Sequence, residues 1–307
     1  MNIKDLKGNL FLLVATIIWG CTFVAQDIAA EIISPFEFQA VRTLIGALVL
    51  VPVILIMDGT KKKNGTYVKL TKAESKNLLL GGLVCGFCHC IAACLQQWGL
   101  ALGTTPGKSG FITAMYIIFV PIIGLFLKKK IQPHIYGCIV FAVAGLYLLC
   151  VGSEKFTVAL GDAVTLICAV AFAFHITSVS LFVEKNDCVK LSFLQFVFSG
   201  LIACVMTLIF EGAFHPELIV QVIGPILFAG VLSCGVAYTF QVIGQKLSSS
   251  TTVASLIMSF ESVVATVAGA IILHQMMSGR ELVGCALMFI AIIFSQIDLN
   301  TLFKKAK

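Results

Sequence analysis

Charged residues are scarce in this chain. They make up 12% of its 307 residues, against 59% that are hydrophobic. Since the connections between its apolar stretches are all short, a soluble domain of any size is excluded. The sequence also lacks a phosphate-binding glycine loop followed by Lys and Ser or Thr, so ATP is not expected to drive it unless another chain supplies it. It has no nucleophile and base at a recognisable spacing, which disfavours an enzyme.

Long apolar stretches occupy most of the sequence. A bilayer core of about 30 Å requires roughly 20 helical residues, and about ten stretches near that length follow one another. The expected spans are residues 8–28, 35–57, 77–101, 106–127, 133–151, 161–183, 191–212, 218–241, 250–273 and 281–297. We therefore predict an all-α integral membrane protein with about ten transmembrane helices.

The second five spans repeat the pattern of the first five. Gly137 and Cys138 recur as Gly284 and Cys285, and the Thr-Thr pair at 104–105 recurs at the same offset. Because five is an odd number, the second half enters the membrane from the opposite side, which gives two inverted five-helix repeats in one membrane unit. Their predicted extents are residues 1–152 and 153–307. Inverted halves can open alternately to either side, with a solute site near the midplane.

The positive charges indicate the orientation. Most of the 21 Lys and Arg residues share one side of the membrane if both termini are cytoplasmic, as expected for short loops. We predict a multi-pass protein of the cytoplasmic (plasma) membrane with both termini inside. The net charge of +6 lies beside helix ends, where anionic lipid headgroups are its expected partners and nucleic acid is not. The sequence leaves open whether the protein forms a homodimer.

Several segments resemble the EamA domain of the drug/metabolite transporter (DMT) superfamily. They are residues 98–149, IIWGCTFVAQ at 17–26, FQAVRTLIGAL at 38–48 and ASLIMSFESVVATVAGAIIL at 254–273. The resemblance covers nearly the whole chain. It implies a secondary carrier, usually an exporter of small metabolites, with a central cavity lined by helices from both halves.

Ionisable residues inside the spans are candidates for coupling, because a charge at the bilayer centre costs about 2.5–3.5 kcal/mol even on insertion scales. Glu261 is the deepest acid. It is a candidate to bind and release a proton during transport, or it forms a hydrogen bond across a helix contact. His89 is a second candidate for proton coupling, and His175 is also mid-helix; interior histidines with satisfied hydrogen bonds are the alternative for both.

Polar side chains at helical spacing are candidates for cavity walls. Ser255, Ser259 and Ser262 fall on one face of the ninth span. Such hydroxyls can also hold helices together. The expected solute-binding residues are Trp19, His89, Gln96, Lys108, Ser109, Thr113, Tyr116, His175, Tyr238, Gln241, Ser255, Ser259 and Ser262.

Lys108 and Arg42 are cations within or near the spans. Lys108 could hold an anionic group of the solute, or its stem could extend to the membrane surface. Arg42 lies deeper and needs a partner, such as Glu37, Asp27 or a backbone carbonyl. Prolines remove backbone hydrogen bonds inside two other spans, so Pro121 and Pro225 are candidate flexing points for gating.

The cysteine-rich segment CGFCHCIAAC at 85–94 contains the Cys-x-x-Cys-His pattern of haem attachment. Its position inside an apolar span argues against haem or metal, so no cofactor is expected. Gly82, Gly86, Cys90 and Cys94 recur at every fourth position. This spacing predicts a ridge of small side chains that lets another helix approach closely.

Two functions from different classes remain. The sequence favours a carrier that moves a small organic or drug-like solute by alternating access, coupled to protons or another gradient. The alternative is a membrane-embedded sensor or enzyme that acts on a lipid or redox substrate through His89, His175 and the cysteines.

Overall fold

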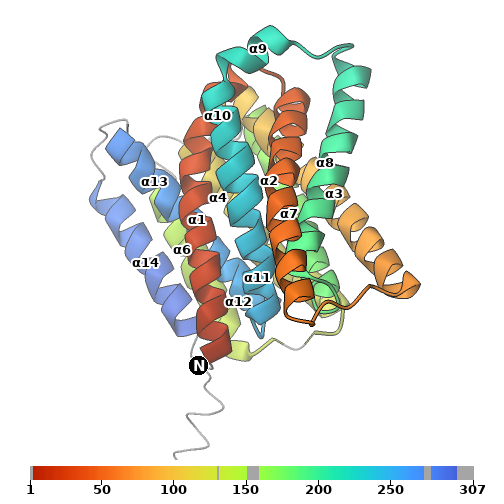
Figure 1. The fold of residues 1–307 in the computed structure, drawn as a ribbon. Coiled ribbons are helices and arrows are strands. Elements are labelled where there is room, and N and C mark those ends of the chain that lie inside the picture. The colour runs from red at the N-terminus through yellow and green to blue at the C-terminus, as the bar shows by residue number, and fades with distance from the viewer. Residues whose placement is uncertain (1–2, 130, 151–158, 273–277, 296–307) are drawn as a thin grey trace, which may run out of the picture.

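The computed structural model describes residues 3–129, 131–150, 159–272 and 278–295 (Figure 1). In the first half the helices are α1 (Ile3–Ala30), α2 (Pro35–Lys63), α3 (Lys72–Ala101), α4 (Pro106–Ala114), α5 (Tyr116–Phe126) and α6 (Pro133–Cys150). In the second half they are α7 (Leu160–Phe182), α8 (Cys188–Phe210), α9 (Pro216–Gln221), α10 (Ile223–Leu227), the π-helix η1 (Phe228–Tyr238), α11 (Thr239–Leu247), α12 (Thr251–Met258), α13 (Glu261–Ile272) and α14 (Gly279–Ser295).

The helices have the length and surface of a membrane bundle. Within the described residues, eight helical segments are long and apolar enough to cross a bilayer. Two shorter apolar helices, Pro133–Leu148 and Leu282–Ser295, occupy the places of the expected fifth and tenth spans. Large apolar side chains such as Phe126, Phe210 and Val140 face outward, where lipid rather than water is their natural solvent. The predicted all-α membrane fold is confirmed.

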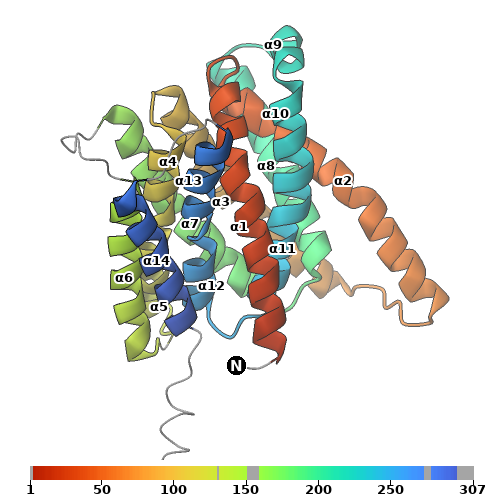
Figure 2. The same cartoon turned by 90° about the vertical axis from the view of Figure 1, so that its left-hand side faces the viewer.

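The two halves pack on each other in corresponding ways (Figures 1 and 2). α2 packs against α8, its counterpart, and α6 packs against α14. The contact of α3 with α7 corresponds to that of α1 with η1 and α11. Likewise, α4 and α5 pack on α7 as α12 and α13 pack on α1. Both halves therefore contribute helices to the packing of the bundle interior.

The bundle has a lysine-rich end and an opposite end. The lysine-rich end holds the start of α1 and the connections α2–α3, α5–α6, α7–α8 and α11–α12. The opposite end holds the connections α1–α2, α3–α4 and α8–α9. Figure 1 shows the N-terminus at the lysine-rich end and α9 at the opposite end.

Side-chain caps fix where several helices begin. Ser34 accepts a hydrogen bond from the backbone N–H of Glu37 at the start of α2, directly before Pro35. Thr71 and Glu74 form a reciprocal capping box at the start of α3. These caps satisfy backbone N–H groups that the first turn of a helix leaves without an acceptor.

The small residues of α3 allow it to lie very close to α8. A Cβ placed on Gly82 would be 2.4 Å from the Cβ of Leu194, and one on Gly86 would be 2.6 Å from the carbonyl oxygen of Gln195. Cys90 and Cys94 continue the same face, in a cluster with Ala203 of α8 and Ala40 of α2. The predicted ridge of small side chains is confirmed.

Three expected spans differ from the structure in their details. The fourth span, 106–127, is interrupted at Met115, and the ninth, 250–273, at Ser259 and Phe260. The eighth was expected at 218–241, but the long segment runs from Ile223 to Leu247 and α9 is separate. Hydropathy does not register such breaks, because each interruption is only one or two residues long and hardly changes the mean over a span.

The two candidate gating prolines occupy different surroundings. Pro121 lies within α5, six residues after the Met115 interruption. Pro225 lies in α10 and is followed by η1, whose π-helical hydrogen bonding extends over 11 residues. π-helical turns are rare and frequently occur at functional sites, and η1 contributes to the cavity described next.

Candidate functional site

A small central cavity lies between the two halves. Its volume is about 30 Å³, which has room for only one or two water molecules. The lining residues are Trp19, Thr22, Phe23, Gln26, Arg42, Gln96, Thr113, Tyr116, Phe172, Ile176, Ser233, Tyr238, Gln241, Met258 and Glu261. They come from α1 to α5 and from α7, η1 and α11 to α13, so both halves supply walls.

Glu261 places a carboxylate in this cavity. It is 6% exposed and is the first residue of α13, directly after the interruption of the ninth span. Its Oε1 accepts a hydrogen bond from the Tyr116 hydroxyl at 3.1 Å, and Tyr116 directly follows the corresponding interruption of the fourth span. The two breaks thus bring an acid and its donor together, beside the electropositive start of α13.

Arg42 places a guanidinium in the same cavity. It is 2% exposed, and its Nε donates to Gln39 Oε1 at 2.7 Å. Its guanidinium carbon lies 5.2 Å from the centre of the Phe38 ring. The partner is therefore Gln39 rather than Glu37, Asp27 or a carbonyl. Its Nη2 is buried and has no hydrogen-bond acceptor among the described residues, so a donor remains for a group entering the cavity.

Glutamine side chains separate the cavity from the opposite end. Gln26 Nε2 donates to Gln96 Oε1 at 3.1 Å and to Gln97 Oε1 at 3.2 Å, while Gln97 donates back to the carbonyl oxygen of Gln26. Gln96 Nε2 also donates to Thr113 Oγ1. These bonds join α1, α3 and α4 across the bundle. Amide hydrogen bonds can exchange partners, so this layer can open without exposing a charge.

Aromatic rings form one wall. The rings of Trp19 and Tyr238 have centroids 4.7 Å apart and bring α1 and η1 together. The indole Nε1 of Trp19 is buried without an acceptor among the described residues. A wall of this type offers an apolar face together with a hydrogen-bond donor.

His89 and His175 lie behind Tyr238 and do not line the cavity. Both are 0% exposed, and their rings are 5.4 Å apart. His89 Nδ1 lies 3.0 Å from Ser199 Oγ, and His175 Nε2 lies 3.1 Å from Gln195 Oε1. Gln39 also contacts His89 and, through its other amide atom, Arg42. A polar network therefore runs from the histidines to the cavity wall.

The remaining expected site residues lie outside the cavity. Lys108 forms an ion pair with Asp162 of α7, and Ser109 is fully buried beside it. Ser255 and Ser259 donate to carbonyl oxygens of their own helix. Ser262 donates to the carbonyl oxygen of Gly110 and thereby joins α13 to α4.

The structure thus brings together part of the expected set. Seven members line the cavity: Trp19, Gln96, Thr113, Tyr116, Tyr238, Gln241 and Glu261. Sequence reasoning missed Arg42, Thr22 and Gln26 as wall residues. A signal for the last two existed, because they follow Trp19 by three and seven residues on one helical face. Arg42 is recognisable in the sequence as a cation within a span, but the direction in which its side chain points depends on how α2 packs.

Ion pairs join α2 to α8 at the lysine-rich end. Lys61 Nζ is 3.2 Å from Asp187 Oδ2, and Lys190 Nζ is 2.8 Å from Asp58 Oδ2. Burial alone would raise the pKa of Asp187, but the backbone N–H of Lys190, the Lys61 ammonium and the backbone N–H of Val189 outweigh it and hold the pKa below its usual range. The charged form of Asp187 is therefore part of this contact.

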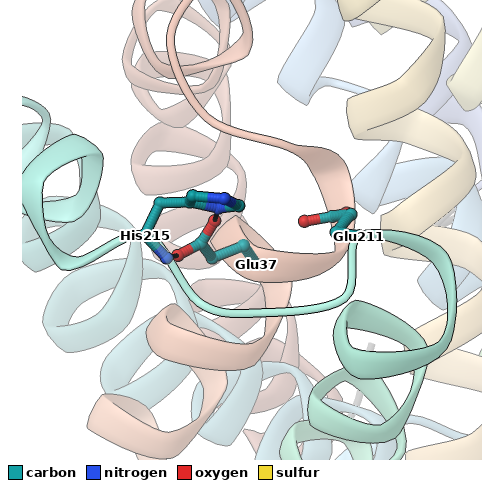
Figure 3. A group of neighbouring side chains, drawn as sticks. All are labelled: Glu37, Glu211 and His215. Atoms are coloured by element: carbon teal, nitrogen blue, oxygen red, sulfur yellow. Dashed lines mark hydrogen bonds and ion pairs between the residues drawn. The ribbon is translucent and has the colours of Figure 1, made fainter.

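A second group of titratable residues lies at the opposite end, where α2 begins (Figure 3). Glu37 is 1% exposed and accepts hydrogen bonds from the backbone N–H of His215 at 2.6 Å and from its ring Nδ1 at 3.3 Å. Glu211 points toward the same place from the α8–α9 connection. Burial raises the pKa of Glu211; the Glu37 charge raises it further, against a Ser34 hydrogen bond and His215.

Among the described residues, these three are the group whose spacing could hold a metal ion. One ligand atom from each of Glu37, Glu211 and His215 lies within 4.8 Å of the others. A zinc ion would need contacts of about 2.0–2.2 Å to each atom, so the group would have to contract, and both Glu37 oxygens already accept hydrogen bonds. The arrangement better fits a hydrogen-bonded contact between α2 and the α8–α9 connection.

Comparison with known proteins gives a consistent family. The EamA-like transporter family matches residues 6–151 and 159–296. An uncharacterized transporter of Archaeoglobus fulgidus is 27% identical over 298 residues, covering 95% of this chain and 86% of the relative. The uncharacterized transporter YoaV of Bacillus subtilis is 25% identical over 288 residues, covering 92% and 94%. A solved crystal structure shares the fold with a TM-score of 0.70 at 16% identity, covering 94% of this chain and 96% of its own.

Proposed function

The chain belongs to the EamA-like transporter family, and from this premise we propose that it is a secondary-active exporter of a small organic metabolite or drug-like solute. The solute binds in the central cavity, and the two halves expose it alternately to either side of the membrane. Glu261 exchanges a proton during the cycle. The solute leaves unchanged, which distinguishes the protein from an enzyme.

The observation that carries this proposal is a buried basic residue and a buried acidic residue in one cavity. Arg42 and Glu261 are 2% and 6% exposed, and none of the ion pairs among the described residues joins them. Buried charges without an ionic partner are costly. A solute, a proton or both can reduce that cost, which supports a binding and coupling role for this position.

The size of the cavity supports alternating access. Sites for small molecules typically measure about 300–1,000 Å³, far more than the roughly 30 Å³ of this cavity. The helices must therefore separate before a solute can bind. The glutamine layer on one side and the ion pairs of Lys61 and Lys190 on the other are the contacts that would open in turn. We place the lysine-rich end in the cytoplasm.

The first test is binding and flux. The purified protein is heated in detergent with amino acids, nucleosides, sugars, organic acids and cationic drugs, and solutes that raise the unfolding temperature are tested for transport into proteoliposomes. A ligand at 100 times its Kd adds about 2.7 kcal/mol if it binds only the folded state. Transport of an unchanged solute supports the proposal. Chemical conversion of the solute would refute it.

The second test addresses coupling. Glu261→Gln keeps the size of the side chain and its ability to accept from Tyr116 but removes the exchangeable proton. We expect proton-driven accumulation to be abolished while solute exchange continues. Glu217→Gln, at an exposed position of α9, is the matched control and should accumulate normally. Accumulation by Glu261→Gln at the rate of the control would exclude Glu261 from coupling.

A further inference from the structure

A separate and larger cavity lies at the lysine-rich end. Its volume is about 310 Å³, roughly ten times that of the central cavity. Its walls come from α5, the α5–α6 connection, α7, the α11–α12 connection and the start of α12. The polar lining residues are Lys129, Thr177 and the run 249–252 of Ser-Ser-Thr-Thr. None of the lining residues is needed for the function proposed above.

Every polar side chain that lines this cavity can donate a hydrogen bond. Lys129 is half-buried and brings a positive charge, and the lining includes no carboxylate. The run 249–252 leads into α12, an eight-residue helix capped by Ser250, whose Oγ accepts from Val253 N–H. The first turn of a helix leaves other N–H groups without intrahelical acceptors, and its electropositive end attracts anions.

Thr177 gives an independent indication of a ligand. It is 5% exposed and lines the cavity, and its Oγ1 is buried with no hydrogen-bond partner among the described residues. A buried hydroxyl without a partner costs roughly 1–3 kcal/mol. Threonines elsewhere in the bundle, such as Thr43, donate to carbonyl oxygens of the preceding turn. Thr177 instead leaves its hydroxyl without a partner among the described residues beside the cavity, where a ligand oxygen could satisfy it after a rotation of the side chain.

The equivalent position in the first half has the opposite charge. A cavity of about 250 Å³ lies at the start of α4 and includes Thr104 and Thr105, which correspond in the repeat to Thr251 and Thr252. There the charged lining residues are Asp27 and Glu31. The repeat therefore conserves the hydroxyls at the helix start, while the charge beside them differs between the two ends.

We propose that the cavity at the start of α12 binds a phosphate group. Lys129 supplies the countercharge, backbone N–H groups and hydroxyls at the start of α12 donate to the phosphate oxygens, and Thr177 donates its hydroxyl proton from α7. The Asp5 carboxylate accepts a hydrogen bond from the Ser249 N–H at 3.1 Å but does not line the cavity. The phosphate comes either from a soluble anion or from an anionic lipid headgroup at this end of the bundle.

Four variants of the full chain test the site. Lys129→Gln removes the charge, and Lys128→Gln is its control, since Lys128 is exposed and does not line the cavity. Thr177→Val removes the hydroxyl at constant size, while Thr177→Ser keeps it. Binding of inorganic phosphate is measured in neutral detergent by thermal shift at constant ionic strength. We expect affinity to fall at least ten-fold in Lys129→Gln and Thr177→Val and to stay unchanged in Lys128→Gln and Thr177→Ser.

A second arm identifies the source of the phosphate. Each variant is placed in nanodiscs of phosphatidylcholine with or without phosphatidylglycerol. Stabilisation by phosphatidylglycerol that Thr177→Val abolishes and Thr177→Ser retains assigns the site to a lipid headgroup; the same pattern with inorganic phosphate alone assigns it to a soluble anion. The proposal is overturned if neither probe stabilises the protein, or if Thr177→Val responds like wild type. None of these readouts uses transport, so they stand apart from the proposed carrier function.

Discussion

The close approach of α3 and α8 provides a quantitative test of the packing. In Gly82→Ala the new Cβ would lie 2.4 Å from Leu194 Cβ, whereas ordinary van der Waals contact begins near 3.4 Å. Because the opposing atom is attached directly to the backbone of α8, a rotamer change cannot relieve the clash. The two helices must therefore move apart by about 1 Å.

That displacement has two costs. Overpacking of this kind typically costs about 1–3 kcal/mol, and the higher helix propensity of Ala returns up to about 1 kcal/mol. The bond between His89 Nδ1 and Ser199 Oγ, 3.0 Å long, lies along the same interface. Separation of the helices would stretch it toward the 3.5 Å limit and remove roughly 1 kcal/mol more. We expect a net destabilisation of about 1–3 kcal/mol.

Thermal unfolding followed with a thiol-reactive dye measures this effect, because Cys85, Cys90 and Cys94 on α3 are buried and react only when the helix is exposed. Gly59→Ala in α2 is the control, since nothing lies within 4 Å of its new Cβ; it should be neutral or slightly stabilising. If Gly82→Ala unfolds at the same temperature as Gly59→Ala, then α3 and α8 are not in the close contact described above.

Two further predictions concern pH. The folded-state pKa of Asp187 is lowered, so the contribution of its charged carboxylate to stability is complete above the unfolded pKa of about 3.9 and is lost as pH falls through the folded pKa. Asp187→Asn should therefore destabilise the protein at pH 7 and converge with wild type in acid. Unfolding temperatures measured from pH 7 to pH 3 check this. Since the pKa of Glu211 is raised, the charged carboxylate is a cost at neutral pH. Glu211→Gln should therefore unfold at a higher temperature than wild type at pH 8. The gain should shrink as pH falls through the raised folded pKa and should be gone below the unfolded value of about 4.3. A pH-independent difference in either variant would contradict the corresponding argument.

Parts of the candidate site were accessible from the sequence because they depend on local spacing. Tyr116 and Thr113 share a helical face, and Glu261 is an isolated acid in an apolar span; all three line the cavity. The histidines were equally conspicuous, but the structure places them behind Tyr238. Depth along a span can be read from a sequence, whereas rotation about the helix axis follows from packing against several neighbours.

The sequence by itself determined the number and type of the apolar helices, the correspondence of the halves and the ridge of small residues on α3, because hydrophobicity and helical period are local properties. Only the tertiary structure decided that Gln39 is the partner of Arg42 and that Thr177 lines a cavity with no hydrogen-bond partner among the described residues. It also decided that the fourth and ninth helices break where Tyr116 meets Glu261. These features depend on which residues from distant parts of the chain meet, and in a bilayer that is set by close packing and by the need to satisfy each buried polar group.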